Sequence, residues 1–150
     1  MTAMLKIDDA GFVRAPIDLV YRRITHVGAW PQWWPGLEVR PLPPVADRER
    51  WGLGLQRGRS RLLRTCAAIF GWRHEQGMLI ELSGDLRGDA ELWLEPVSGG
   101  TVVHHVASVA SDLHLARHAV VGYRRGVRRG LWGLKDALQL EMRTSLGLTP

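Results

Sequence analysis

Residues 113–145, LHLARHAVVGYRRGVRRGLWGLKDALQLEMRTS, decide the fold, because they predict one long amphipathic helix. Asp112, directly before them, is a good N-cap residue. At about 1.5 Å per residue the helix would be roughly 50 Å long, so one end is expected to project beyond a small sheet. Its apolar side chains recur along one stripe: Ala116, Ala119, Tyr123, Val127, Leu131, Leu134 and Leu138.

The middle of the chain predicts antiparallel strands joined by tight turns. Ala90, Leu92 and Leu94 alternate with polar neighbours, and residues 96–100 have the composition of a hairpin turn. Prolines 41, 43 and 44 predict a break after a short strand. The strand candidates span residues 37–40, 51–56, 60–70, 73–85, 90–95 and 101–110.

The N-terminal part predicts a strand followed by two short helices. Residues 3–14 form the strand candidate, with a break expected at residues 10–11. Pro16 suits the first position of a helix, and Gly28 ends that helix. The segment WPQWWP at residues 30–35 has room for one further turn. A long helix laid across a curved antiparallel sheet leaves a hollow, so we predict an α+β domain with a binding cavity.

Length and composition limit the class of protein. The chain has 150 residues, 45% hydrophobic and 23% charged, which predicts a single globular domain over residues 1–150. No apolar run approaches the roughly 20 residues of a membrane span, and Asp8 and Asp9 stand where a signal peptide would be apolar. Cys66 is the only cysteine, so one chain cannot form a disulfide or a cysteine-based metal site. We therefore expect a cytoplasmic protein.

The net charge of +5 raises the question of an anionic partner. Arginines cluster at residues 57–64 and 117–129, and in the second cluster they flank the apolar stripe of the predicted helix. Neither a helix-turn-helix pattern nor paired aromatics in a basic strand accompany them. We therefore expect no nucleic-acid partner and a solvated face made of Arg124, Arg125, Arg128 and Arg129.

Four motifs follow one another over nearly the whole chain. They are FVRAPIDLVY at 12–21, WPQW at 30–33, GDAELWLEP at 88–96 with GGT at 99–101, and RGVRRGLWGLK at 125–135. Their order resembles the START-like (SRPBCC) superfamily, in its polyketide cyclase/dehydrase-like branch. The resemblance implies a helix-grip fold, in which a seven-stranded antiparallel sheet wraps around the C-terminal helix and encloses an apolar cavity. Members include lipid and hormone carriers, coenzyme Q-binding proteins and aromatase/cyclases, so the activity stays open.

Glycines recur along the predicted C-terminal helix. Gly122, Gly126 and Gly130 are four residues apart and line one strip, which His118 extends. Each glycine costs about 1 kcal/mol relative to alanine in a helix, so something is expected to approach the backbone closely. Two interpretations are open. The strip leaves room for a ligand, or it packs tightly on the sheet or on a second subunit, which would make a homodimer.

The ligand-binding candidates combine apolar surface with a few polar atoms. Aromatic rings can line an apolar pocket and still offer one N–H that orients a ligand, although ordinary core packing explains any single tryptophan equally well. The candidates are Trp30, Trp33, Trp34, Trp51, Met78, Leu92, His105, His118, Gly122, Tyr123 and Gly126.

Adjacent histidines raise a question of strand parity. His104 and His105 point to opposite faces of a strand, so at most one faces the cavity. A two-residue turn at Ser98 and Gly99 pairs Leu92 with His105 and places His105 inside. A one-residue change in the turn places His104 inside instead.

The catalytic candidates are Tyr123, His105 and Arg64, because a buried tyrosine or arginine needs a polar partner that a ligand oxygen could supply. No two of them share a motif, so we expect them to be dispersed. The histidines lack the spacing of a metal site, and we expect neither a metal nor a cofactor.

These features predict that the protein binds a hydrophobic or aromatic small molecule, such as a lipid, a polyketide or an isoprenoid-like compound. The alternative is a polyketide cyclase/aromatase-like enzyme that positions a reactive chain and moves protons with Tyr123, an inward histidine or Arg64. A third interpretation is an interaction module that uses the basic helix and an exposed tryptophan.

Overall fold

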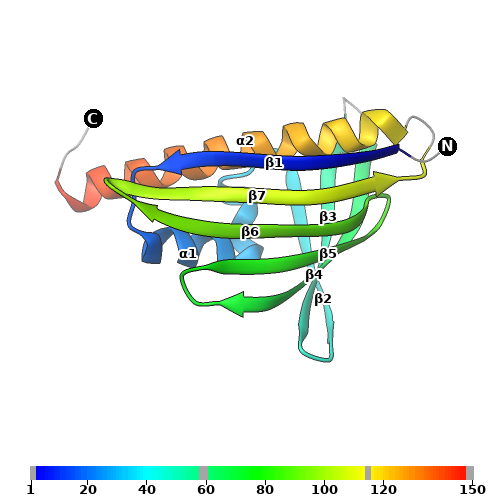
Figure 1. Ribbon diagram of the computed structural model, residues 1–150, viewed down its shortest axis with the longest axis horizontal. Helices are drawn as coiled ribbons and strands as arrows, with labels where there is room; N and C mark the ends of the chain where they lie inside the picture. The colour runs from blue at the N-terminus through cyan, green and yellow to red at the C-terminus, as the bar shows by residue number, and fades with distance from the viewer. Residues whose placement is uncertain (1–2, 58–60, 114–115, 148–150) are drawn as a thin grey trace.

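A computed structural model describes residues 3–57, 61–113 and 116–147, in which one sheet curves around one long helix (Figure 1). The chain begins with β1 (Ala3–Val13), α1 (Ile17–Thr25) and the 3-10 helix η1 (Val27–Gln32). The remaining elements are β2 (Leu37–Val45), β3 (Arg48–Arg57), β4 (Arg61–Arg73), β5 (Gly77–Gly84), β6 (Arg87–Val97), β7 (Gly100–Ser111) and α2 (Ala116–Ser145).

The seven strands form one antiparallel sheet in the order β1-β7-β6-β5-β4-β3-β2. The chain leaves β1 at one edge, crosses by α1 and η1 to β2 at the other edge, and returns strand by strand to β7. Helix α2 then runs along the sheet beside β1 (Figure 1). The predicted α+β class, with two short helices after the first strand and a closing helix, is confirmed.

The β6–β7 hairpin settles which histidine faces inward. Val97 pairs with Gly100, so the turn has two residues, and the second of them, Gly99, has a positive φ of 83°, which glycine adopts readily. Leu92 therefore lies opposite His105. His105 is buried on the concave face of the sheet, whereas the half-buried His104 stacks on Trp93 on the convex face.

Two expected breaks in the strands are wrong. Strand β1 continues through residues 10–11 and pairs with β7 along its whole length. Strand β2 continues to Val45 through the three prolines, with a shift of register between Leu42 and Val45. Proline is tolerated there because β2 is an edge strand, whose free side needs no N–H donors.

Glycines of α2 allow the helix to pack closely on the tryptophan segment, residues 30–35, whose Trp33 and Trp34 follow η1. A Cβ on Gly133 would lie 1.7 Å from the Trp33 carbonyl oxygen, and a Cβ on Gly130 would lie 2.8 Å from Cδ2 of Trp34. A Cβ on Gly126 would make ordinary contact with Trp34, at 3.7 Å. Close packing of α2 on this segment thus accounts for Gly130 and for Gly133, which the spacing of four residues does not include.

At the N-terminal end of the glycine strip, Gly122 is not needed for close packing. Gly122 is exposed, and a Cβ added there would meet nothing within 4 Å. His118 is exposed as well. The expected start of the helix falls partly on residues 114–115, outside the described residues. Asp112, the expected N-cap, accepts hydrogen bonds from the Arg87 guanidinium.

Among the described helices, none combines the length and the apolar character that a bilayer-spanning segment needs.

Candidate functional site

An apolar cavity lies between the inner face of the sheet and α2. Strands β3 to β7 contribute one wall, α2 contributes the opposite wall, and the tryptophan segment closes one side. Apart from His105 and Tyr123, the residues that line it are Ile24, Trp30, Trp33, Trp34, Leu53, Leu55, Ala67, Ile80, Leu82, Leu92, Val103, Val127, Leu131 and Leu134.

The cavity is small in this structure, with a volume of about 40 Å³. A water molecule needs roughly 10–15 Å³ measured in this way, so the space would hold only a few waters. Pockets for drug-sized ligands are about 300–1,000 Å³. The cavity therefore has the apolar lining of a ligand site, but side chains must move before a ring system can enter.

His105 and Tyr123 form the polar part of the cavity. His105 projects from β7 and Tyr123 from α2, and 2.9 Å separates His105 Nε2 from the Tyr123 hydroxyl oxygen. Burial lowers the pKa of His105 to about 4, against a smaller opposing effect of the Asp9 carboxylate. Burial also raises the pKa of the Tyr123 hydroxyl well above its ordinary value. Both groups are therefore neutral near neutral pH, and one neutral hydrogen bond joins them.

Two buried nitrogen atoms on cavity residues lack a partner. Within the described part of the chain, neither His105 Nδ1 nor Trp33 Nε1 has a hydrogen bond. By contrast, Trp30 Nε1 donates to the Ile24 carbonyl oxygen at 3.0 Å. A buried polar atom without a partner costs about 1–3 kcal/mol. A ligand oxygen that accepted the Trp33 N–H bond would recover part of this free energy.

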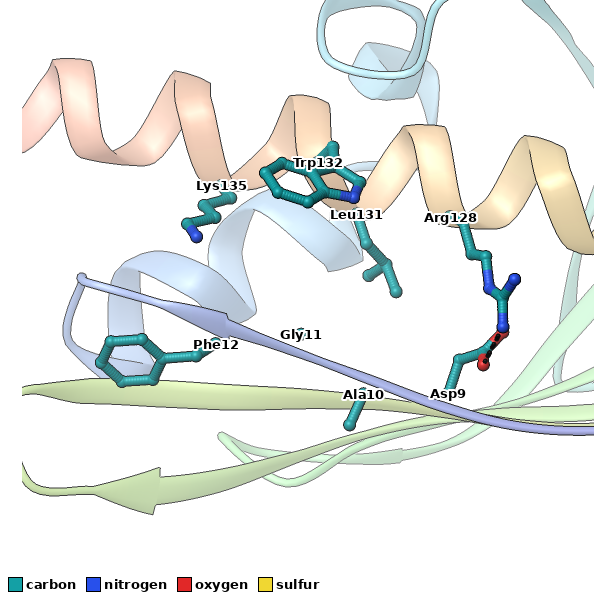
Figure 2. Close-up of a pocket in the computed structure, with 8 residues that line it drawn as sticks. All are labelled: Asp9, Ala10, Gly11, Phe12, Arg128, Leu131, Trp132 and Lys135. Carbon is teal, nitrogen blue, oxygen red and sulfur yellow. Dashed lines mark hydrogen bonds and ion pairs between the residues drawn. The ribbon is translucent and has the colours of Figure 1, made fainter.

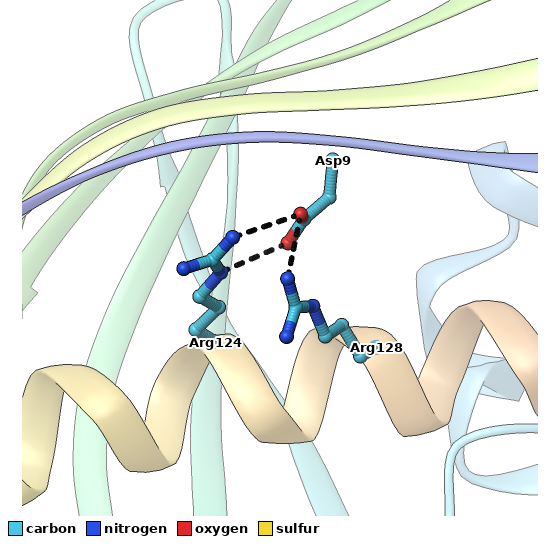
Figure 3. A network of polar contacts seen from close by, with 3 residues as sticks. All are labelled: Asp9, Arg124 and Arg128. Carbon is cyan, nitrogen blue, oxygen red and sulfur yellow. Dashed lines mark hydrogen bonds and ion pairs between the residues drawn. The ribbon is translucent and has the colours of Figure 1, made fainter.

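Asp9 joins β1 to α2 through Arg124 and Arg128 (Figure 3). It lies opposite His105 in the β1–β7 register, and its side chain is only 12% exposed. Arg124 donates to both carboxylate oxygens, at 3.3 and 3.4 Å, and Arg128 donates to Oδ1 at 3.2 Å. Burial alone would raise the pKa of Asp9, but the two guanidinium groups outweigh it and hold the pKa below its ordinary value.

This contact corrects one prediction and adds one residue. Arg124 and Arg128 bind the sheet and are not part of a purely solvated face, whereas Arg125 and Arg129 are exposed as expected. From the sequence, Asp9 was expected only to argue against a signal peptide. The alternation along β1 could have revealed its role, because it places Asp9 on the inner face of the strand with Leu5, Ile7, Gly11 and Val13. A carboxylate on that face needs a partner.

Several of the predicted site residues come together, and others do not. The structure brings six of them to the cavity lining: Trp30, Trp33, Trp34, Leu92, His105 and Tyr123. Six lie elsewhere: Trp51, Met78, His118, Gly122, Gly126 and Arg64.

The reasons for the second group differ. Met78 is fully buried in the core, and Trp51 packs against Gly28 with its Nε1 bonded to Glu49. Arg64 is exposed, because its neighbours on β4 take the inward positions. The expected dispersal of the catalytic candidates is thus half wrong, since His105 and Tyr123 meet and only Arg64 stands apart.

Among the described residues, no three histidine, cysteine, aspartate or glutamate side chains gather as metal ligands would.

Solved structures match the chain over almost its whole length. The Zhui aromatase/cyclase from Streptomyces sp. R1128 has a TM-score of 0.77 at 11% identity, covering 95% of this chain and 98% of that one. The di-domain aromatase/cyclase StfQ of the steffimycin biosynthetic pathway has a TM-score of 0.74 at 12% identity, covering 93% of this chain and 52% of that one. No protein-family model and no curated protein matches the chain.

At these identities the likeness shows the fold. The seven-stranded antiparallel sheet, the closing helix α2 and the agreement with these polyketide aromatase/cyclases together show that the chain has the helix-grip fold.

Proposed function

We propose that the cavity between the sheet and α2 binds an apolar or aromatic small molecule that carries a hydrogen-bonding oxygen, in the class of lipids, polyketides and isoprenoids. The observation that carries the proposal is the pair of buried, unpartnered nitrogens, His105 Nδ1 and Trp33 Nε1, on residues that line an otherwise apolar cavity. The fold shared with polyketide aromatase/cyclases supports a ligand of polyketide type.

Binding requires the cavity to expand, because 40 Å³ cannot hold a ring system. The ligand would separate side chains that now touch, and it would bury its own apolar surface in exchange. The gain is about 25 cal/mol for each Å² of apolar surface removed from water. The polar atoms would then select among apolar ligands, since only a ligand with a correctly placed oxygen satisfies them.

The test is a substitution that fills the cavity from the sheet side. Ala67 on β4 lines the cavity and is fully buried, whereas its neighbour Ala68 points to the other face. We expect Ala67→Val to weaken binding of 2-naphthamide, a neutral aromatic probe, about tenfold or more, and Ala68→Val to leave it unchanged. Isothermal titration calorimetry measures both affinities. Equal affinities for the two variants and the wild type would exclude the cavity as the site.

The hydrogen bond between His105 and Tyr123 favours a second candidate function, a cyclase/aromatase-like enzyme. A neutral histidine can accept a proton from a polyketide carbon or hydroxyl, and the tyrosine hydroxyl can donate one to a developing oxyanion. Turnover of a poly-β-ketone mimic would fall by orders of magnitude in Tyr123→Phe if this pair moves protons. Wild-type protein that binds the mimic without converting it would leave binding as the function.

A further inference from the structure

A second pocket opens on the surface between β1 and α2 (Figure 2). Its volume is about 340 Å³, the size of a small-ligand pocket. Gly11 lies on the inner face of β1, and its missing side chain leaves the pocket open, since a Cβ there would meet only Leu131, at 3.9 Å. Phe12 and Trp132, 38% and 65% exposed, supply aromatic surface at the rim.

The pocket carries an excess of positive charge. Arg128 and Lys135 line it, together with Asp9 as its one carboxylate. That carboxylate is already shared between Arg128 and Arg124. Within the described residues Lys135 has no carboxylate partner, and its Nζ lies 5.1 Å from the Trp132 ring centre. An anion that entered would meet the Arg128 guanidinium and the Lys135 ammonium group, while Arg124, outside the pocket lining, helps to neutralise the one carboxylate.

Leu131 separates the surface pocket from the inner cavity. It lines both spaces and lies on α2 between Arg128 and Lys135 (Figure 2). Leucine changes rotamer readily, because its side chain has several staggered minima. A rotation that moved Leu131 aside would join a space of ligand size to the cavity that holds His105 and Tyr123. Leu131 thus borders both spaces.

We propose that this surface pocket is the entrance to the cavity and that it selects an amphipathic anion. The ligand would be an aromatic or aliphatic molecule whose carboxylate stays between Arg128 and Lys135 while its apolar part passes Leu131 into the cavity. This inference rests on the proposed function and adds to it the ligand's charge and its route.

The experiment compares 2-naphthoate with its neutral analogue 2-naphthamide by isothermal titration calorimetry at low salt. We expect the wild type to bind 2-naphthoate about three- to fivefold more tightly, the size of one partly exposed ion pair. Lys135→Gln should abolish this preference. Lys6→Gln, an identical change on the outer face of β1, should keep it. Equal affinities for the two probes in the wild type, or a preference that survives in Lys135→Gln, would overturn the proposal.

Gly11→Val tests the route. Valine suits a strand, and its Cβ makes only ordinary contact with Leu131, so the variant should fold, as its thermal unfolding would show. We expect it to slow the association of both probes, which stopped-flow tryptophan fluorescence measures, because a blocked route lowers the rate of entry. Association as fast as in the wild type would refute the entrance.

The outcomes also separate this inference from the cavity proposal. If Ala67→Val weakens 2-naphthamide but no carboxylate preference exists, the cavity stands and the anion site falls. If binding depends on Lys135 but not on Ala67, the ligand stays at the surface and both proposals are wrong. If neither probe binds, both are wrong for aromatic ligands of this size.

Discussion

Alanine substitutions at Gly122 and at Gly133 should change stability in opposite directions, although both replace a glycine within α2. An alanine gains about 1 kcal/mol over glycine in a helix interior, because its backbone loses less entropy on folding. At Gly122 nothing lies within 4 Å of the new methyl group, so the full gain should appear. For a chain of this length it corresponds to a rise in Tm of about 2–4 °C.

At Gly133 the same methyl group would lie 1.7 Å from the Trp33 carbonyl oxygen. This contact is with backbone, so relief requires α2 and the tryptophan segment to separate. Overpacking of a core costs about 1–3 kcal/mol, and a backbone clash belongs at the upper end. After the propensity gain of about 1 kcal/mol, the net loss should be about 2 kcal/mol.

The two intermediate glycines should fall between these extremes. Gly126→Ala should stabilise, because its new contacts with Trp34 are at 3.7 Å, and Gly130→Ala should destabilise, because Cδ2 of Trp34 would be 2.8 Å away. Urea denaturation followed by far-UV circular dichroism measures all four variants. Equal or greater stability of Gly133→Ala than of the wild type would refute close packing of α2 on the tryptophan segment.

Two further predictions concern titratable groups. The pKa of His105 is about 4 in the folded protein and 6.5 ordinarily, so the unfolded state binds the proton more tightly. Stability should therefore fall by about 3 kcal/mol as pH drops through this interval. In His105→Phe the urea midpoint should vary less over the same interval, and an unchanged pH profile would contradict the assignment. Asp9→Asn should cost about 1–2 kcal/mol, because Arg124 and Arg128 lose a charged acceptor. The carboxylate contribution is present above the ordinary pKa of aspartate and is lost as pH falls through its lowered folded value. Asp8→Asn, on the outer face of β1, is the matched control and should change stability little; an equal loss in both variants would argue against the Asp9 contact.

The sequence was sufficient to predict those elements whose side-chain spacing follows directly from backbone geometry. Side chains alternate along a strand and recur every 3.6 residues along a helix, so the strands and the stripe of α2 could be predicted from spacing alone. The hairpin turn at residues 98–99 could also be predicted from local sequence. Once the turn has two residues, the pairing of Leu92 with His105 follows, and only the turn length needed the structure.

Contacts between elements distant in the chain could not be predicted in this way. Gly133 is needed because the Trp33 backbone crosses α2 at that point, and no spacing within the helix reveals it. Asp9 binds Arg124 and Arg128, more than a hundred residues away.

The sequence by itself determined the order of elements, the antiparallel sheet and the closing helix, because each depends on periodicity and on turn chemistry. Only the tertiary structure decided that His105 meets Tyr123, that Arg64 faces outward and that the cavity is nearly closed. Strand register and the fit of side chains from several elements determine these features. Both arise when the sheet curves around α2, since a shift of one residue or one rotamer would change which atoms meet.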